Sequence, residues 1–299
     1  MNPIGMTALI SAFARAYHAE NNEVTIFCDT ISKKLLTEEE YNGIASAMTD
    51  GMAYFGLPAD TDRAAALRQI TDRHLSPIPL ARAAFAEQTL QTAVRVGARQ
   101  YVILAAGYDT FAYRQPAFAN RLSIWELDVP AVMADKQMRL ERAGIPTPAN
   151  VHRLCGDLAG EGWRQALLES GFDRDAITVV SLLGLTYYLP KEAFAALLKD
   201  LRWLLPTGST LVFEYPDALT GRMNLQRDLA DGAQEPMTAV YSYAEMERLL
   251  AEQGFSVYEH LNPSQMTAQY FARYQRACPE HPMTATEHVN YVCAVKTPV

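Results

Sequence analysis

Two hydrophobic patterns divide the chain near residue 98. From Met6 to Gly97 the apolar positions recur at helical spacing, and Thr37 with Glu40 forms a capping-box pattern at the start of one predicted helix. After residue 98, short apolar runs alternate with helical patterns. We therefore expect a helical block at residues 1–98 and an α/β core at residues 99–299, which together form one structural unit.

Seven apolar runs predict the strands of this core. Helical patterns separate the first six runs, and Ser242 with Glu245 forms a second capping box before Gly254. This alternation favours right-handed βαβ units and a mostly parallel sheet covered on both faces. The last two runs break the rhythm, so we expect one of them to run antiparallel. The runs are residues 101–105, 122–127, 151–154, 177–183, 210–215, 255–261 and 289–295.

Composition and charge narrow the classes of partner. Hydrophobic residues make up 49% of the 299 residues, enough for a large buried core. The net charge of −8 disfavours nucleic acid and anionic membranes. No run reaches the ~18 uncharged apolar residues of a membrane span, and the first 20 residues lack a signal-peptide pattern, so we expect a cytoplasmic protein. The four cysteines are scattered, which predicts buried thiols and no metal site.

The turn after the first predicted strand is a candidate ligand site, because ligands of open α/β sheets bind at the carboxyl ends of the strands. Small residues occupy three successive positions there, Ala105, Ala106 and Gly107. The glycine-rich fingerprint of a dinucleotide site is absent. An ordinary tight turn, with Asp109 or Thr110 capping the next helix, is an equally good interpretation of this segment.

Two acidic residues follow the next strands. Asp128 lies 128 − 107 = 21 positions after Gly107, where nucleoside-binding α/β proteins hold the ribose hydroxyls. Its alternative role is the N-cap of the helix at residues 130–143. Asp157 and Leu158 end the third strand and could contact an adenine edge and ring, although Asp157 could also be a plain turn residue. Such a site without phosphate-binding glycines suits a nucleoside whose sugar carries no phosphate, and S-adenosyl-L-methionine is such a ligand.

These segments also resemble a known family, the leucine carboxyl methyltransferases, which include bacterial polyketide carboxyl O-methyltransferases of the tetracenomycin type. The resemblance runs from about Arg15 to Pro190 and rests on four blocks in order: residues 100–114, residues 126–130 with Lys136, residues 156–158, and Gly184 with residues 188–190. It implies the class I methyltransferase fold, a Rossmann-like sheet of seven strands whose last strand is antiparallel.

Carried onto this chain, the resemblance places the Ala105–Gly107 turn beside the methionine part of S-adenosyl-L-methionine, Asp128 at the ribose, and Asp157 with Leu158 at the adenine. It pairs Arg82 with the carboxylate of the cofactor, a task that suits a guanidinium, although a solvated helix arginine is the plainer interpretation. Two positions depart from the family pattern. Phe111 stands where the family often has arginine, and Leu183 stands where it usually has an acidic residue before Gly184.

The implied reaction is methyl transfer to a carboxylate of a small molecule. A carboxylate is already ionised at neutral pH, because its ordinary pKa is about 4, and needs no general base. A hydroxyl or amine acceptor would benefit from a positioned base, but none of the six histidines lies in the strand-end motifs. Weak candidates for the methyl path are tyrosines at strand ends, although such residues more often pack in the core: Tyr108, Tyr187, Tyr188 and Tyr215.

Substrate selection is expected from the helical block and from the insertion at residues 216–240. Within this insertion Arg222 and Arg227 could clamp an anionic acceptor, although a solvated surface role suits either. Two other functions stay open: a cofactor-binding scaffold that has lost catalysis, motivated by Phe111 and Leu183, and a nicotinamide-dependent oxidoreductase, which lacks its pyrophosphate loop here. The sequence predicts neither the acceptor nor the oligomeric state.

Overall fold

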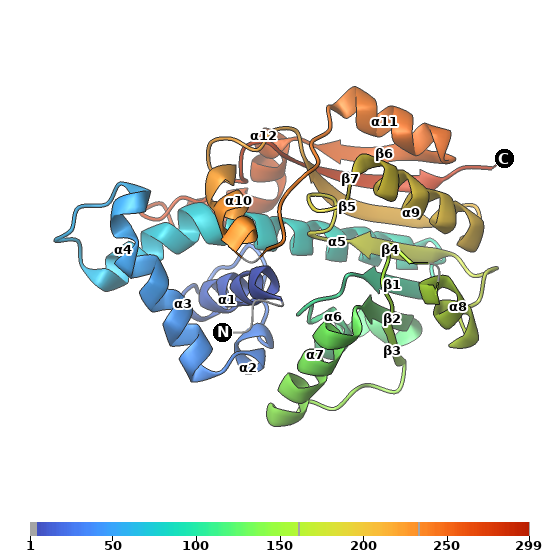
Figure 1. Ribbon diagram of the computed structural model, residues 1–299, viewed down its shortest axis with the longest axis horizontal. Helices are drawn as coiled ribbons and strands as arrows, with labels where there is room; N and C mark the ends of the chain where they lie inside the picture. Colours follow the sequence, from blue (N-terminus) through green and yellow to red (C-terminus); the bar gives the residue numbers. More distant parts are fainter. Residues whose placement is uncertain (1–4, 161, 233, 299) are drawn as a thin grey trace.

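A seven-stranded sheet forms the centre of the computed structural model, which describes residues 5–160, 162–232 and 234–298 (Figure 1). All seven predicted strands are present, within two residues of the expected bounds at each end. Their spatial order is β3-β2-β1-β4-β5-β7-β6. The strands are β1 (Gln100–Leu104), β2 (Ser123–Asp128), β3 (Val151–Cys155), β4 (Thr178–Leu182), β5 (Thr210–Pro216), β6 (Phe255–Leu261) and β7 (Val289–Lys296).

The direction of the strands confirms the expected class I methyltransferase topology. β3, β2, β1, β4 and β5 pair in parallel, while β7 lies between β5 and β6 and pairs antiparallel with both. The strand order reverses at β1, because the chain moves from β1 to β2 and β3 on one side and to β4 on the other. Ligands of open α/β sheets bind at such a reversal.

Helices cover both faces of the sheet and extend beyond one end of it (Figure 1). Short 3-10 or π segments connect several of them: η1 (Met52–Phe55), η2 (Thr71–Leu75), η3 (Ala117–Arg121) and η4 (Thr267–Phe271). The helices are α1 (Met6–Glu20), α2 (Ser32–Leu35), α3 (Glu38–Asp50), α4 (Arg63–Ile70), α5 (Pro77–Arg95), α6 (Phe111–Arg114), α7 (Pro130–Arg142), α8 (Gly162–Glu169), α9 (Lys191–Leu204), α10 (Met223–Gly232), α11 (Tyr243–Glu252), α12 (Pro263–Met266) and α13 (Ala272–Ala277).

Local sequence signals account for several helix ends. The Thr37 hydroxyl accepts a hydrogen bond from the Glu40 N–H at 3.0 Å, and Ser242 caps α11 in the same way, so both predicted capping boxes are confirmed. α11 ends before Gly254, whose φ of +76° lies in the left-handed region that glycine tolerates. Pro77 starts α5, where its missing N–H costs nothing.

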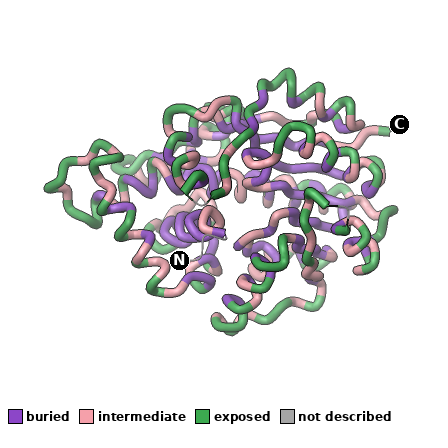
Figure 2. Tube along the Cα trace, viewed as in Figure 1, coloured by how far each residue is buried: buried purple, intermediate pink, exposed green. Residues whose placement is uncertain are grey.

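Three apolar cores hold the layers together, and buried residues run continuously through the sheet and the neighbouring helices (Figure 2). One core packs α8, α9 and α11 on one face of the sheet, and another packs α5 on the opposite face. The third joins α1, α2 and α3 to Tyr108, to Leu140 of α7 and to Leu225 of α10. Helices α1, α2 and α3 therefore share a core of their own, while α5 of the same block packs directly against the sheet.

Two further expectations concern membranes and cysteines. Among the helices of the described residues, none combines the length and hydropathy needed to cross a bilayer. The expectation of four buried thiols is wrong. Only Cys293 is buried, Cys278 is half-buried, and Cys28 and Cys155 are exposed because they lie in a loop and at the exposed end of β3.

Candidate active site

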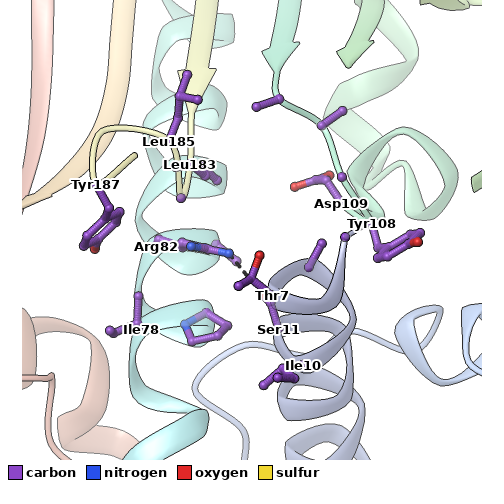
Figure 3. Close-up of a pocket in the computed structure, with 18 of the residues that line it drawn as sticks. Thr7, Ile10, Ser11, Ile78, Arg82, Tyr108, Asp109, Leu183, Leu185 and Tyr187 are labelled. Carbon is purple, nitrogen blue, oxygen red and sulfur yellow. Dashed lines mark hydrogen bonds between the residues drawn. The ribbon is translucent and has the colours of Figure 1, made fainter. Parts of the chain in front are cut away.

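A cavity of about 550 Å³ lies at the carboxyl ends of β1 and β4, between the sheet and helices α1, α5 and α10. It therefore occupies the predicted ligand position at the reversal of strand order. Figure 3 shows its centre, where Arg82 projects from α5 toward Thr7 and Ser11 of α1. The sheet contributes backbone turns on one side, and the helical block closes the other.

The turn after β1 forms the floor of the cavity and has an unusual backbone. Ala105 and Gly107 have φ angles of +51° and +42°, in the left-handed region. The Ala106 N–H donates to the Leu127 carbonyl at 3.1 Å, which ties the turn to β2. The φ of Gly107 is one that L side chains rarely adopt, and a Cβ built there would be in ordinary contact with the Ala8 Cβ at 3.4 Å, so the backbone conformation itself favours glycine at this position. The backbone thus stays open to a ligand.

Asp128 lines the cavity at the end of β2. One carboxylate oxygen accepts from the Gly107 N–H and the other from the Val129 N–H, both at 2.7 Å. Burial raises the pKa of this carboxyl, and the two N–H donors oppose the shift. The alternative role as a helix cap is not what the structure shows, because Val129 is the N-cap of α7 and has no side-chain cap. Each oxygen keeps lone-pair capacity for a further donor, such as a ribose hydroxyl.

Arg82 also lines the cavity, which excludes the interpretation as a solvated helix arginine. Its guanidinium donates to the Ser11 hydroxyl at 3.0 Å and to Glu214 Oε1 at 3.2 Å. A Cβ at Gly184 would lie 2.5 Å from Arg82 Nη1. The glycine after β4 therefore makes the space that the guanidinium occupies.

Sequence reasoning missed Glu214, which lies within β5 and is fully buried. Its Oε1 accepts from the Gly184 N–H at 2.8 Å as well as from Arg82. A signal was available, because a charged residue interrupts the otherwise apolar run of residues 210–215. A charge in the centre of a buried strand needs a partner and thereby indicates a polar site.

A second buried cluster, also missed, joins the helical block to the turn after β1. Arg15 donates to Asp29 at 2.9 Å and to the Tyr108 carbonyl at 2.7 Å, and the Thr110 hydroxyl donates to Asp29 at 2.8 Å. Burial would raise the pKa of the Asp29 carboxyl, but Arg15, Ser32 and Arg114 outweigh it and lower this pKa to about 2. Asp29 is therefore a carboxylate at neutral pH.

The two departures from the family pattern have visible consequences. Phe111 is buried and packs edge-on against the Tyr101 ring at 5.0 Å, so it belongs to the core as well as to the cavity wall. Leu183 lines the cavity without offering a polar group. Nearby, Arg114 lines the cavity and pairs with Glu87 at 2.7 Å. Asp109 accepts from the Phe111 N–H at 2.8 Å, as the tight-turn interpretation expects.

Several candidate residues do not reach the cavity. Asp157 and Leu158 follow β3 outside its lining, and the Asp157 carboxylate accepts from the Ala159 N–H in an exposed turn. Tyr187 and Tyr188 do line the cavity. Tyr215 does not, because it packs in the core on the α9 side of the sheet, with its hydroxyl 3.0 Å from His260 Nε2.

The two arginines expected to clamp a substrate also lie outside the cavity lining. Arg222 donates to the Ala285 carbonyl at 2.7 Å, and Arg227 to the Leu219 carbonyl at 3.3 Å. Other residues of α10 line the cavity: Met223, Gln226 and Leu229, which recur every three residues. Both arginines donate to backbone carbonyls of the protein, so residue charge alone did not identify the residues of this segment that line the cavity.

The family model of leucine carboxyl methyltransferases matches residues 8–202 of this chain. The chain belongs to this family. The match covers most of the helical block, the turn after β1 and the Gly184 turn, which build most of the cavity; α10 lies outside it. The resemblance noted from the sequence motifs is thereby confirmed.

Two similar proteins from other bacteria support the assignment to a methyltransferase family. The chain is 35% identical over 306 residues to YktD of Bacillus subtilis (strain 168), which is provisionally named an S-adenosyl-L-methionine-dependent methyltransferase, and 99% of each chain is covered. A protein of Mycobacterium marinum with the same provisional name is 30% identical, over 84% of this chain and 73% of its own length. The protein is an S-adenosyl-L-methionine-dependent methyltransferase.

Solved structures show the fold. A DUF574 family protein from Streptomyces avermitilis superposes with a TM-score of 0.57 at 13% identity, covering 96% of this chain and 97% of the other. A protein from Thermobifida fusca, provisionally described as a methyltransferase, gives a TM-score of 0.51 at 15% identity, with 84% and 94% covered. Both likenesses extend over most of the chain, which confirms the class I methyltransferase architecture.

Proposed function

We propose that this enzyme methylates a carboxylate of a small molecule. The observation that carries the proposal is the set of polar groups that the cavity offers for proton transfer. Among the described residues that line the cavity there is no histidine and no lysine, and each carboxylate already accepts a hydrogen bond from the protein. Burial raises the pKa of Tyr187 well above its ordinary value and that of Tyr188 to about 12, so both phenols stay protonated.

The fit of the residues supports a nucleoside cofactor at the sheet side of the cavity. The open turn at residues 105–107 admits a ligand close to the backbone, Asp128 has free lone pairs for ribose hydroxyls, and Arg82 offers a guanidinium for a carboxylate tail. We further propose that Asp157 and Leu158, beyond the cavity lining, contact the adenine.

When bound, S-adenosyl-L-methionine supplies a methyl group that moves to an acceptor oxygen as the C–S bond breaks, with the electron pair staying on sulfur. The protein has to hold the two reactants aligned in a dry space, and it need not move a proton. The helical block and α10 supply the apolar wall for the acceptor through Ile10, Ile78, Met223 and Leu229. We propose that the block at residues 1–98 selects the substrate in this way.

The test is methyl transfer from tritium-labelled S-adenosyl-L-methionine to sets of small molecules that share one skeleton and differ only in carrying a carboxylate, a hydroxyl or an amine. We expect label only in the acids, as a methyl ester that mild base releases as volatile methanol. Base-stable label in an alcohol or amine would overturn the carboxylate assignment. Binding of S-adenosylhomocysteine without transfer to any set would favour the scaffold alternative.

A further inference from the structure

Glu214 of β5 is completely buried and contacts two residues that line the cavity, Gly184 and Arg82. Its Oε1 accepts from Gly184 N–H at 2.8 Å and from Arg82 Nη1 at 3.2 Å. Among the described residues, no group donates to its Oε2. Glu214 itself does not line the cavity, whereas Arg82 and Gly184 do. Its carboxylate therefore lies directly behind two cavity residues.

Strand register explains how a residue of β5 reaches the turn after β4. Leu182 of β4 pairs with Phe213 of β5, and both side chains lie in the core on the α9 side of the sheet. Because side chains alternate along a strand, Leu183 and Glu214 face the opposite side, toward α5. Glu214 thus brings a carboxylate to the level of Leu183, the position at which the family pattern has its acidic residue.

Electrostatics favour a fixed arrangement of this pair. A fully buried carboxylate is costly unless a cation and hydrogen-bond donors compensate it, and Arg82 with the Gly184 N–H provides both. The Arg82 side chain is 19% exposed and reaches the cavity with its remaining donors. Three contacts hold its position: Glu214 behind it, Ser11 in front of it, and the Gly184 backbone, which approaches without a Cβ.

We propose that Glu214 is a positioning residue for cofactor binding: from β5 it fixes the Arg82 guanidinium and the Gly184 turn. The inference rests on the proposed role of Arg82 at the amino-acid tail of the cofactor. It is independent of the identity of the methyl acceptor.

A second buried ion pair provides a matched control. Glu126 on β2 pairs with Lys136 at 2.7 Å, and both side chains are fully buried. The Tyr113 hydroxyl also donates to Glu126, at 2.6 Å. Glu126, Lys136 and Tyr113 all lie outside the cavity lining. Substitution of Glu126 therefore reports what the loss of a buried carboxylate does to the fold alone.

The experiment is calorimetric titration of the full chain with two ligands, S-adenosylhomocysteine and 5′-methylthioadenosine, which lacks the amino-acid tail. We expect Glu214→Gln to weaken S-adenosylhomocysteine by about 10- to 100-fold, the range for one charge-assisted contact, and to leave 5′-methylthioadenosine within about twofold. In an Arg82→Ala background, Glu214→Gln should add no further loss. Glu126→Gln should lower the melting temperature without separating the two ligands.

Equal weakening of both ligands by Glu214→Gln, or an additive effect in the Arg82→Ala background, would overturn the proposal. If Arg82→Ala itself does not separate the two ligands, the assignment of Arg82 fails and the inference fails with it. The labelling assay tests the carboxylate acceptor independently of this result. Should Glu214→Gln not fold, Glu214→Asp serves instead, because it keeps the buried charge but draws the carboxylate back from Arg82 and Gly184, and the same ligand-selective loss is expected.

Discussion

The two sides of the cavity are built by different physical means. On the sheet side, the turn after β1 is placed by strand register and main-chain hydrogen bonds, and the strands below it are buried and apolar. On the helical side, buried and half-buried ion pairs fix the docking. Arg15 pairs with Asp29 at 2.9 Å, and Arg139 of α7 donates to both oxygens of Glu40 on α3 at 2.7 Å.

This difference corresponds to a difference in proposed role: the sheet side holds the cofactor, and the helical side selects the substrate. Backbone pairing places the strands of the cofactor side, so their buried apolar residues tolerate exchange for others of similar volume. The helical side depends on a few arginines and carboxylates, because each pair must find its partner at a defined place. We therefore expect changes in the ion pairs to loosen the helical block, and changes in the apolar residues of the sheet to act on global stability.

The largest effect is expected from Asp29→Asn. The substitution leaves the buried Arg15 without its carboxylate, which costs about 3–5 kcal/mol for a broken buried pair. Urea unfolding measures the change in the free energy of unfolding. The control is Asp50→Asn, whose exposed pair with Arg63 is worth about 0–1 kcal/mol. A loss for Asp29→Asn no larger than the control would refute the difference between the two sides.

Acid should act next most strongly, through His18. Burial, with Arg68 nearby, lowers the pKa of this imidazole from 6.5 to about 4, and its Nε2 accepts from the Ile26 N–H. The unfolded chain takes up the proton first. The stability that neutral His18 contributes is therefore fully present above pH 6.5 and is lost as the pH falls from 6.5 through 4. The loss is roughly 3 kcal/mol.

Urea unfolding between pH 7.5 and pH 4 measures this loss, and His18→Gln keeps an acceptor without titrating. The variant should flatten the pH dependence in part only, because burial also lowers the pKa of His74 to about 4. An unchanged slope in the variant would show that His18 does not carry this dependence.

A smaller effect is expected from Arg139→Lys. Lysine keeps the charge but cannot donate to both Glu40 oxygens in the planar geometry of a guanidinium, so one charge-assisted hydrogen bond is lost, worth about 1.5–3 kcal/mol. Hydrogen exchange should then speed up in α3 before it does in β1. Uniform exchange across both elements would contradict a local role of this pair.

The smallest effect is expected in the sheet. Ile124→Val on β2 removes one buried methyl group and should cost about 0.5–1.5 kcal/mol, with the same value at pH 7.5 and pH 5. Chemical unfolding at the two pH values measures it. A cost that depends on pH would contradict the view that apolar packing stabilises the sheet while ion pairs stabilise the helical block.

Sequence patterns predict the sheet side of this molecule far better than the helical side. All seven strands follow from apolar runs, and Asp128 follows from its place after the second run, because both signals are local. Asp29 meets Thr110 across 81 positions, and Arg82 meets Glu214 across 132. Such contacts depend on how helices dock, and no spacing along the chain encodes them.

The most direct test of the account is a crystal structure of the full chain with S-adenosylhomocysteine. We predict that the ribose hydroxyls donate to the Asp128 carboxylate and that the amino-acid tail reaches the Arg82 guanidinium, within the cavity at the ends of β1 and β4. A ligand bound elsewhere, or bound in this cavity with its ribose away from Asp128, would contradict the account.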